Sequence, residues 1–136
     1  MEWPLPIEWE FLSFVEVRAY YYNPSGESGV PILSDDGPLH PSVTNPEGAL
    51  LSRGQAGRLA RAFFTPDGPG WAALCGYTPR HAFVFRDEAL RVVAVIELCF
   101  QCMLYRISPK ADFQRIRPDW DALRELVREL SLPVAG

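Results

Sequence analysis

The sequence predicts an α+β domain in which an antiparallel sheet of about four strands carries two helices on one face. Segments rich in β-branched and aromatic residues predict strands, and two segments with apolar residues at helical spacing predict helices. The elements follow the order β-α-β-β-β-α, and short connections between the last three strands favour antiparallel pairing. Strands are expected over residues 14–22, 82–86, 91–99 and 103–107, and helices over residues 51–64 and 119–130.

Length and composition indicate a single soluble domain, residues 1–136. A chain of this size buries enough surface to fold without cross-links. The net charge is −4 and the arginines are scattered, so the basic patch that nucleic acid requires is lacking. The N-terminus has no secretory pattern, and no apolar run reaches the roughly 20 residues of a membrane helix. We expect a cytoplasmic protein with no nucleic-acid partner and no membrane span.

Residues 1–12 are expected to form an extended N-terminal arm, because two prolines in this stretch rule out a regular helix. In the strand that follows, successive side chains point to opposite faces. Val15, Val17, Ala19 and Tyr21 form the more uniformly apolar set. These four side chains are therefore expected to face the core.

Residues 23–48 are expected to form a long loop, since proline and glycine interrupt this stretch repeatedly. Between the interruptions, residues 30–33 predict a short edge strand. His40 lies in the loop, where a lone histidine is usually solvated. A loop of this length inside a small domain is often functional.

Both helices carry recognisable start signals. Ser52 and Gln55 match a capping box at the start of the helix predicted over residues 51–64. The helix predicted over residues 119–130 is bounded by a proline on each side and has an apolar stripe that suits core packing.

The segments 82–86 and 91–99 are expected to pair as a hairpin. Glu97 shares a strand face with apolar residues, so its carboxylate needs a cationic partner. The candidates are Arg80, Arg86 and Arg106.

Cys99 and Cys102 form a C-x-x-C motif. Residues three apart on a regular strand point to opposite faces, so both sulfurs can meet one partner only across a turn. The apolar residues before Cys99 fall at even positions, whereas those after Cys102 fall at odd positions. This change of phase predicts a turn at Phe100–Gln101.

Hairpin pairing also predicts that His81 lies near Cys99, because the start of one antiparallel strand lies beside the end of the next. Cys75 lies a few residues before His81. Three thiolates and one imidazole would complete the tetrahedral ligand set of a structural zinc site. The predicted metal ligands are Cys75, His81, Cys99 and Cys102, with zinc as the cofactor and no catalytic residue assigned.

Three alternatives stay open. The cysteines can be small buried hydrophobes. Cys99 and Cys102 can form a reversible disulfide, with His81 or Arg80 lowering a thiol pKa. The chain can also be a metal-free interaction module whose loop, residues 23–48, contacts a protein partner. An enzyme is the less favoured class, because a triad of Cys99, His81 and Glu97 would lack a nucleophile loop and an oxyanion element.

Several stretches resemble a family of small uncharacterised bacterial proteins over most of the chain. They are VRAYYY from Val17, LHPSVTNPEGALLS over residues 39–52, PRHAFVFRD over residues 79–87 and ELCFQC over residues 97–102.

The family pattern is a cysteine followed by P-R-H-A-F-V-F-Y-D and then C-F-x-C. Arg86 stands where the pattern has tyrosine. The resemblance implies that Cys75, His81, Cys99 and Cys102 belong together, and it supplies no reaction. Some members resemble exported lipoproteins, whose leader this chain lacks.

Overall fold

The computed structural model describes residues 14–34, 37–64, 77–108 and 118–134. It is an α+β fold with one five-stranded antiparallel sheet and two helices, in the order β-β-α-β-β-β-α. The elements are β1 (Glu16–Tyr21), β2 (Ala49–Leu50), α1 (Arg53–Phe63), β3 (His81–Arg86), β4 (Val92–Cys99), β5 (Leu104–Ser108) and α2 (Trp120–Glu129).

The strands lie in the order β2-β1-β3-β4-β5, and all neighbours are antiparallel. The predicted sheet of about four strands gains one member, because the two residues of β2 pair with Arg18 and Ala19 of β1. β3 is central, and five of its six residues are buried. Continuous burial of this kind occurs when both faces of a strand are covered.

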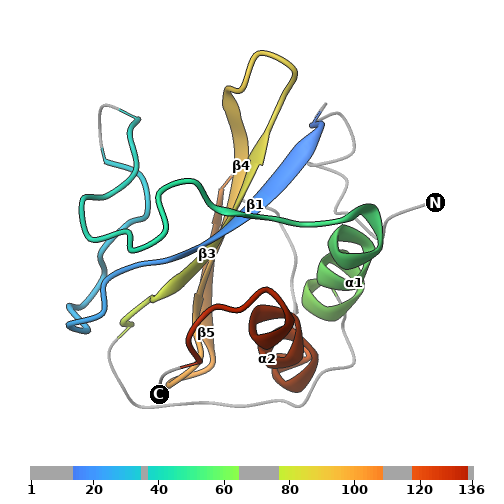
Figure 1. Cartoon of the computed structure of the whole chain (residues 1–136). Helices are drawn as coiled ribbons and strands as arrows, with labels where there is room; N and C mark the ends of the chain where they lie inside the picture. The colour runs from blue at the N-terminus through green and yellow to red at the C-terminus, as the bar shows by residue number, and fades with distance from the viewer. Residues whose placement is uncertain (1–13, 35–36, 65–76, 109–117, 135–136) are drawn as a thin grey trace.

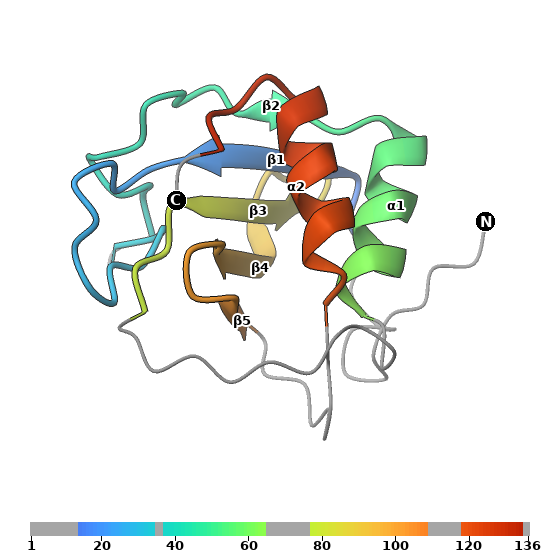
Figure 2. The same ribbon diagram turned by 90° about the horizontal axis from the view of Figure 1, so that it is seen from below.

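The two helices cover one face of the sheet, as predicted (Figure 1). They lie side by side (Figure 2), and the backbone N–H of Asp119 donates to the carbonyl oxygen of Ala62 at 2.8 Å. The predicted capping box is confirmed: Ser52 and Gln55 exchange both hydrogen bonds at the start of α1. We call the apolar cluster between the helices and the sheet the helix-side core.

The loop that follows β1 covers the opposite face of the sheet (Figure 1). Tyr20 and Tyr22 are therefore as buried as Val17 and Ala19, although they point the other way. Val17, Ala19 and Tyr21 are buried as expected, whereas the burial of Tyr20 and Tyr22 was not expected. Val15, which was expected to face the core, is 60% exposed. We call the smaller apolar cluster under the loop the loop-side core.

The loop itself contains little regular structure. The predicted edge strand at residues 30–33 is reduced to an isolated bridge between Leu33 and Leu39. The predicted turn at the C-x-x-C motif is present, because β4 ends at Cys99 and β5 begins at Leu104. The N-terminal arm predicted over residues 1–12 lies outside the described residues. No helix among the described residues is long and apolar enough to cross a membrane.

Candidate functional site

Of the four predicted metal ligands, the structure describes His81, Cys99 and Cys102, whereas Cys75 lies outside the described residues. All three described side chains are buried, with exposed fractions of 1%, 1% and 3%. The described residues contain no group of three or more histidine, cysteine, aspartate or glutamate side chains placed to hold a metal ion.

The His81 side chain is buried on the helix side of the sheet. Its ring lies 5.1 Å from the ring of Tyr21 and 5.0 Å from the ring of Phe100. Nε2 donates to the carbonyl oxygen of Pro133 at 2.6 Å, and Nδ1 is buried without a hydrogen-bond partner. Burial lowers the pKa of His81 to about 4, and the charge of Arg80 acts in the same direction. The imidazole is therefore neutral at physiological pH and joins the sheet to the C-terminal segment.

Cys99 points to the other face of the sheet. His81 pairs with Leu98, so the backbone of Cys99 is close by, as hairpin pairing predicted. Successive side chains on a strand point to opposite faces, however. Because Cys99 follows Leu98, the residue that pairs with His81, its side chain points to the face opposite that of His81. Cys99 Sγ lies 3.6 Å from Thr78 Oγ1, on the loop side. The structure does not bring the Cys99 thiol and the His81 imidazole to one point.

The C-x-x-C motif spans a tight turn. Phe100 and Gln101 lie in this turn, and Met103 takes a positive φ of 53° before β5 begins. Cys102 is buried at this end of the sheet. Cys99 is a free thiol, so the structure does not pair it with Cys102 in the disulfide that the redox alternative requires.

Glu97 is the centre of a buried polar cluster on the loop side. Its carboxylate is 4% exposed and accepts hydrogen bonds at both oxygens. Oε2 accepts from the backbone N–H of Ile32 at 2.8 Å, whereas Oε1 accepts from Tyr77 Oη at 3.0 Å and from Arg106 Nε at 2.9 Å. Arg106 Nη2 completes the ion pair at 2.7 Å from Oε1. Of the three arginines predicted as candidates for this ion pair, Arg106 is the one that forms it. We call Glu97, Ile32, Tyr77 and Arg106 the Glu97 cluster.

The electrostatics of the Glu97 cluster favour a structural role. Burial raises the pKa of Tyr77 well above its usual range, and the nearby Glu97 carboxylate raises it further. The same two causes, in the same order, raise the pKa of Tyr22, whose hydroxyl donates to the Val30 carbonyl oxygen at 2.8 Å. Both phenols remain protonated donors at physiological pH. Both oxygens of the Glu97 carboxylate thus accept hydrogen bonds from donors of the protein itself.

Asn23 and Asn45 fix the two ends of the loop. Asn23 adopts a positive φ of 54°, and its Nδ2 donates to the carbonyl oxygens of Glu27 and Pro79 at 2.7 and 3.0 Å. Asn45 accepts from the backbone N–H of Tyr21 at 2.9 Å and donates to the Ala19 carbonyl oxygen at 3.1 Å. These bonds replace strand pairing where the chain leaves the sheet. The predicted loop histidine, His40, is half-buried, and its Nδ1 bonds to Ser42.

The structure contains a cavity of about 360 Å³ beside the Glu97 cluster. Its walls are mostly apolar, and Glu97 and Arg106 supply the charged groups. The cavity is lined by Pro31, Ile32, Leu33, Val95, Glu97, Arg106, Ile107 and Ser108.

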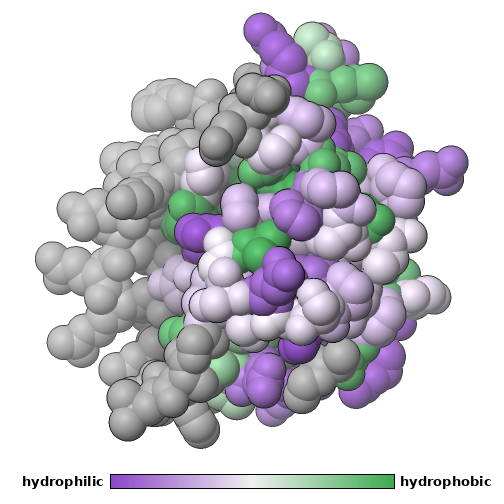
Figure 3. Space-filling model, turned by 90° about the vertical axis from the view of Figure 1, so that its left-hand side faces the viewer, coloured by the Kyte–Doolittle hydropathy of each residue, from purple (hydrophilic) through white to green (hydrophobic). Residues whose placement is uncertain are grey.

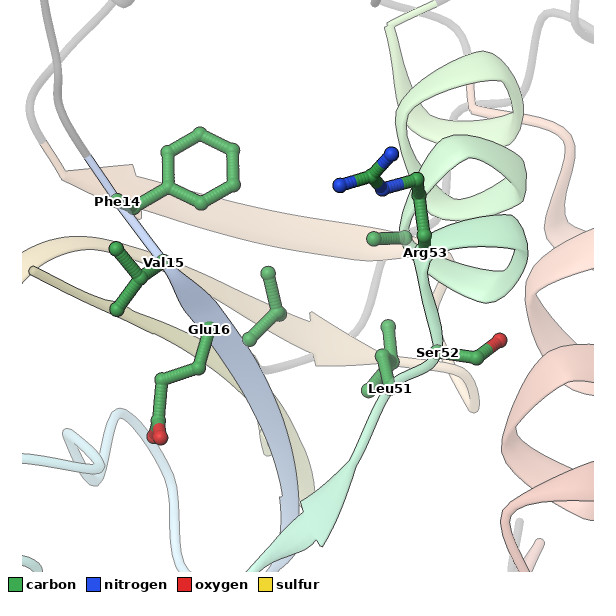
Figure 4. Close-up of a pocket in the computed structure, with 8 residues that line it drawn as sticks. Phe14, Val15, Glu16, Leu51, Ser52 and Arg53 are labelled. Carbon is green, nitrogen blue, oxygen red and sulfur yellow. The ribbon is translucent and has the colours of Figure 1, made fainter. Parts of the chain in front are cut away.

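A second cavity, of about 470 Å³, lies between the start of β1 and the start of α1. Figure 4 shows the Arg53 side chain extending from α1 toward Phe14, whereas the Glu16 side chain points away from Arg53 on the other side of β1. Glu16 instead pairs with Arg18 at 2.8 Å. This cavity adjoins Phe14, the first described residue.

Sequence reasoning identified Glu97 and its arginine candidates but missed the other anchors. Tyr22, Asn23 and Asn45 were not singled out from the sequence. The two asparagines could have been identified as anchors from their positions at the ends of the long loop. Asparagine tolerates a positive φ, and its side chain forms hydrogen bonds readily with nearby backbone.

Comparison with known proteins adds no assignment to this geometry. No protein-family model, curated protein or solved structure matches the chain.

Proposed function

We propose that this chain is a metal-free protein-interaction module that presents its long loop, residues 23–48, to a protein partner. The observation that carries the proposal is the way the loop is fastened to the sheet at its two ends and in its middle. Asn23 and Asn45 hold the ends, and the Glu97 carboxylate holds the Ile32 amide in the middle. A loop fixed before binding loses less conformational entropy when a partner associates.

The outer surface of the loop is available for contact. Residues 24–25, 27–29, 37–38 and 46–47 are exposed, whereas the inward residues Tyr22 and Ile32 are buried. Figure 3 looks onto this side of the molecule, where the coloured surface is mainly polar or intermediate in hydropathy, with small apolar patches. Surfaces of this mixed character are usual in non-obligate interfaces. The cavity beside Arg106 supplies an apolar recess next to the loop.

The placement of the Cys99 thiol and the His81 imidazole supports a binding role over a chemical one. His81 and Cys99 are both about 1% exposed and lie on opposite faces of the sheet. A reactive cysteine needs access and a group that stabilises the thiolate. The Cys99 thiol is enclosed, and among the described residues its sulfur forms a hydrogen bond to the neutral Thr78 hydroxyl.

The test compares two matched surface variants of the full chain in capture experiments from cells of the source organism. The first variant replaces Ser25, Glu27 and Ser28 on the loop with alanine. The second replaces Asp121, Glu125 and Arg128 on the exposed side of α2. The proposal expects a defined captured protein that the loop variant loses and the α2 variant retains.

Equal capture by both variants would contradict the proposal. A second measurement addresses the zinc alternative directly. Purified untagged protein that holds about one zinc per chain, and that melts at a lower temperature after chelation, would replace the proposed function with a metal-stabilised domain.

A further inference from the structure

Arg80 differs from the other arginines in how its charge is balanced. Most arginines of the described residues lie within 4.0 Å of a described carboxylate, and three of them, Arg53, Arg61 and Arg80, do not. Arg53 and Arg61 are exposed on α1, where water solvates their charge. Arg80 is half-buried, and its Nε is enclosed without a hydrogen-bond partner.

A cation that has lost part of its hydration without gaining an anion lowers the stability of the fold. Because Nε is enclosed, a ligand can meet this guanidinium only at its terminal nitrogens, and the contact of Nη1 with Gln101 is exposed. Within the described part of the chain, the guanidinium of Arg80 makes one side-chain hydrogen bond, from Nη1 to Gln101 Oε1, and at 3.4 Å this bond is long.

The surroundings hold Arg80 in place. Its backbone N–H donates to the Leu98 carbonyl oxygen at 3.2 Å, and its own carbonyl oxygen accepts from Tyr22 N–H at 2.9 Å. The guanidinium lies against the turn at Gly26, where an added Cβ would come within 2.5 Å of Nη2. Asn23 fixes this turn through its bonds to the backbone of residues 26 and 27.

We propose that Arg80 is the binding site for a single carboxylate carried by the protein partner. This inference rests on the proposed function and names the chemistry of the partner. A planar guanidinium offers paired donors that match the two oxygens of a carboxylate. One guanidinium beside the neutral amide of Gln101 balances one negative charge, whereas phosphate groups are typically held by clusters of arginine.

The test uses acetate as the probe and NMR of the full-length protein as the measurement. The reporters are Arg80 Nε–H, the Gly26 amide and the side-chain NH2 of Gln101. Acetate is expected to shift all three in a saturable way, and sodium chloride at the same ionic strength is expected to shift them less. Shifts that chloride reproduces would overturn the proposal.

Inorganic phosphate is titrated in parallel. If the shifts saturate at a lower concentration of phosphate than of acetate, the assignment to a carboxylate is overturned.

Variants separate the charge from its geometry. Arg80→Gln is expected to abolish the saturable shifts. Arg80→Lys is expected to weaken acetate binding by about tenfold, because one ammonium group replaces the paired donors of the guanidinium.

Gly26→Ala displaces the guanidinium and should also weaken binding. Gly29→Ala is its matched control, since Gly29 has a similar φ of 70° against 75° but no heavy atom within 4 Å of an added Cβ. Equal binding by the two alanine variants would contradict the site geometry, and circular dichroism checks that each variant is folded.

The failure of this inference can be told apart from that of the proposed function. If Arg80→Gln captures the partner as well as wild type does, the loop surface stands and the carboxylate site is wrong. If acetate binds at Arg80 but loop replacement leaves capture unchanged, the carboxylate site stands and the loop surface is wrong.

Discussion

The two faces of the sheet are buried by different means. On the helix side, two amphipathic helices pack on the strands, and a continuous apolar cluster lies between them. On the loop side, a chain segment with little regular structure covers a smaller cluster and needs polar anchors, of which Asn23 and Glu97 are buried. A helix satisfies its own backbone hydrogen bonds, whereas a loop packed on a sheet must find partners for its N–H and C=O groups.

This difference predicts where substitutions act. The helix side depends on shape and buried area, so losses there should scale with the volume removed. The loop side depends on a few directed bonds, so losses there should follow the loss of a partner for a buried polar group. The following predictions test that distinction in order of decreasing effect.

The largest effect is expected for Phe83→Ala, in the middle of β3. Phe83 is fully buried in the helix-side core, and its truncation should lower the free energy of unfolding by about 4 kcal/mol. Val84, its neighbour on the loop side, is equally buried, and Val84→Ala should cost about half as much because less volume is removed. Urea denaturation measures both, and equal losses would contradict the volume argument.

Glu97→Ala should lower the free energy of unfolding by about 3 kcal/mol, because it leaves the Ile32 N–H and the Tyr77 hydroxyl without their acceptor. Hydrogen exchange should accelerate first at the Ile32 amide and only weakly in α2.

The matched control for this change is Glu125→Ala. Glu125 also pairs with an arginine, Arg128, at 2.8 Å, but both side chains are exposed. Exposed pairs of this kind contribute little to stability. If the two glutamate variants unfold at the same urea concentration, Glu97 is not an anchor of the loop.

Acidification should weaken the helix side through His81. The pKa of His81 in the folded protein is about 4, below its value of about 6.5 in the unfolded chain, so the unfolded chain takes up the proton first. The stability from the neutral ring is present above pH 6.5 and is lost as the pH falls toward 4. We expect a loss of about 2 kcal/mol by pH 5.

A His81→Phe variant isolates this contribution from that of the carboxylates, which titrate in the same range. Its stability should fall less than that of wild type between pH 7 and pH 5. Parallel curves for the two proteins would show that His81 does not titrate as its burial predicts.

The smallest effect is expected for Cys99→Ala. The thiol is buried and makes one weak contact, so its removal should cost about 1 kcal/mol. In the native protein, Cys99 should react with a thiol reagent no faster than the protein unfolds, as peptide mapping of the labelled cysteine can measure. Rapid labelling of Cys99 under native conditions would revive the thiol-redox alternative.

The fold was predictable because its signals are local. The two helix stripes, the capping box at Ser52 and the β3–β4 hairpin depend on residues close together in sequence. β2 was missed because two residues are too few to produce an alternating pattern. The burial of Tyr20 and Tyr22 was missed because it depends on how the loop folds over them.

The candidate site was less predictable, and the reason is geometric. Hairpin pairing correctly brings the backbones of His81 and Cys99 together. Whether their side chains meet depends on a single residue of register, which the sequence pattern does not resolve. The ion-pair partner of Glu97 could be narrowed to a few arginines, because a buried carboxylate requires a cation and few arginines were expected nearby.

The central position of β3 has a consequence for synthesis of the chain. β1 emerges from the ribosome first, but its main partner, β3, is made only after the long loop and α1. At ordinary translation rates, the apolar segment from Val17 to Tyr22 then waits on the order of several seconds without its neighbour. During that interval it is an unpaired, aromatic-rich strand, the kind of segment that chaperones bind and that aggregates when they are scarce.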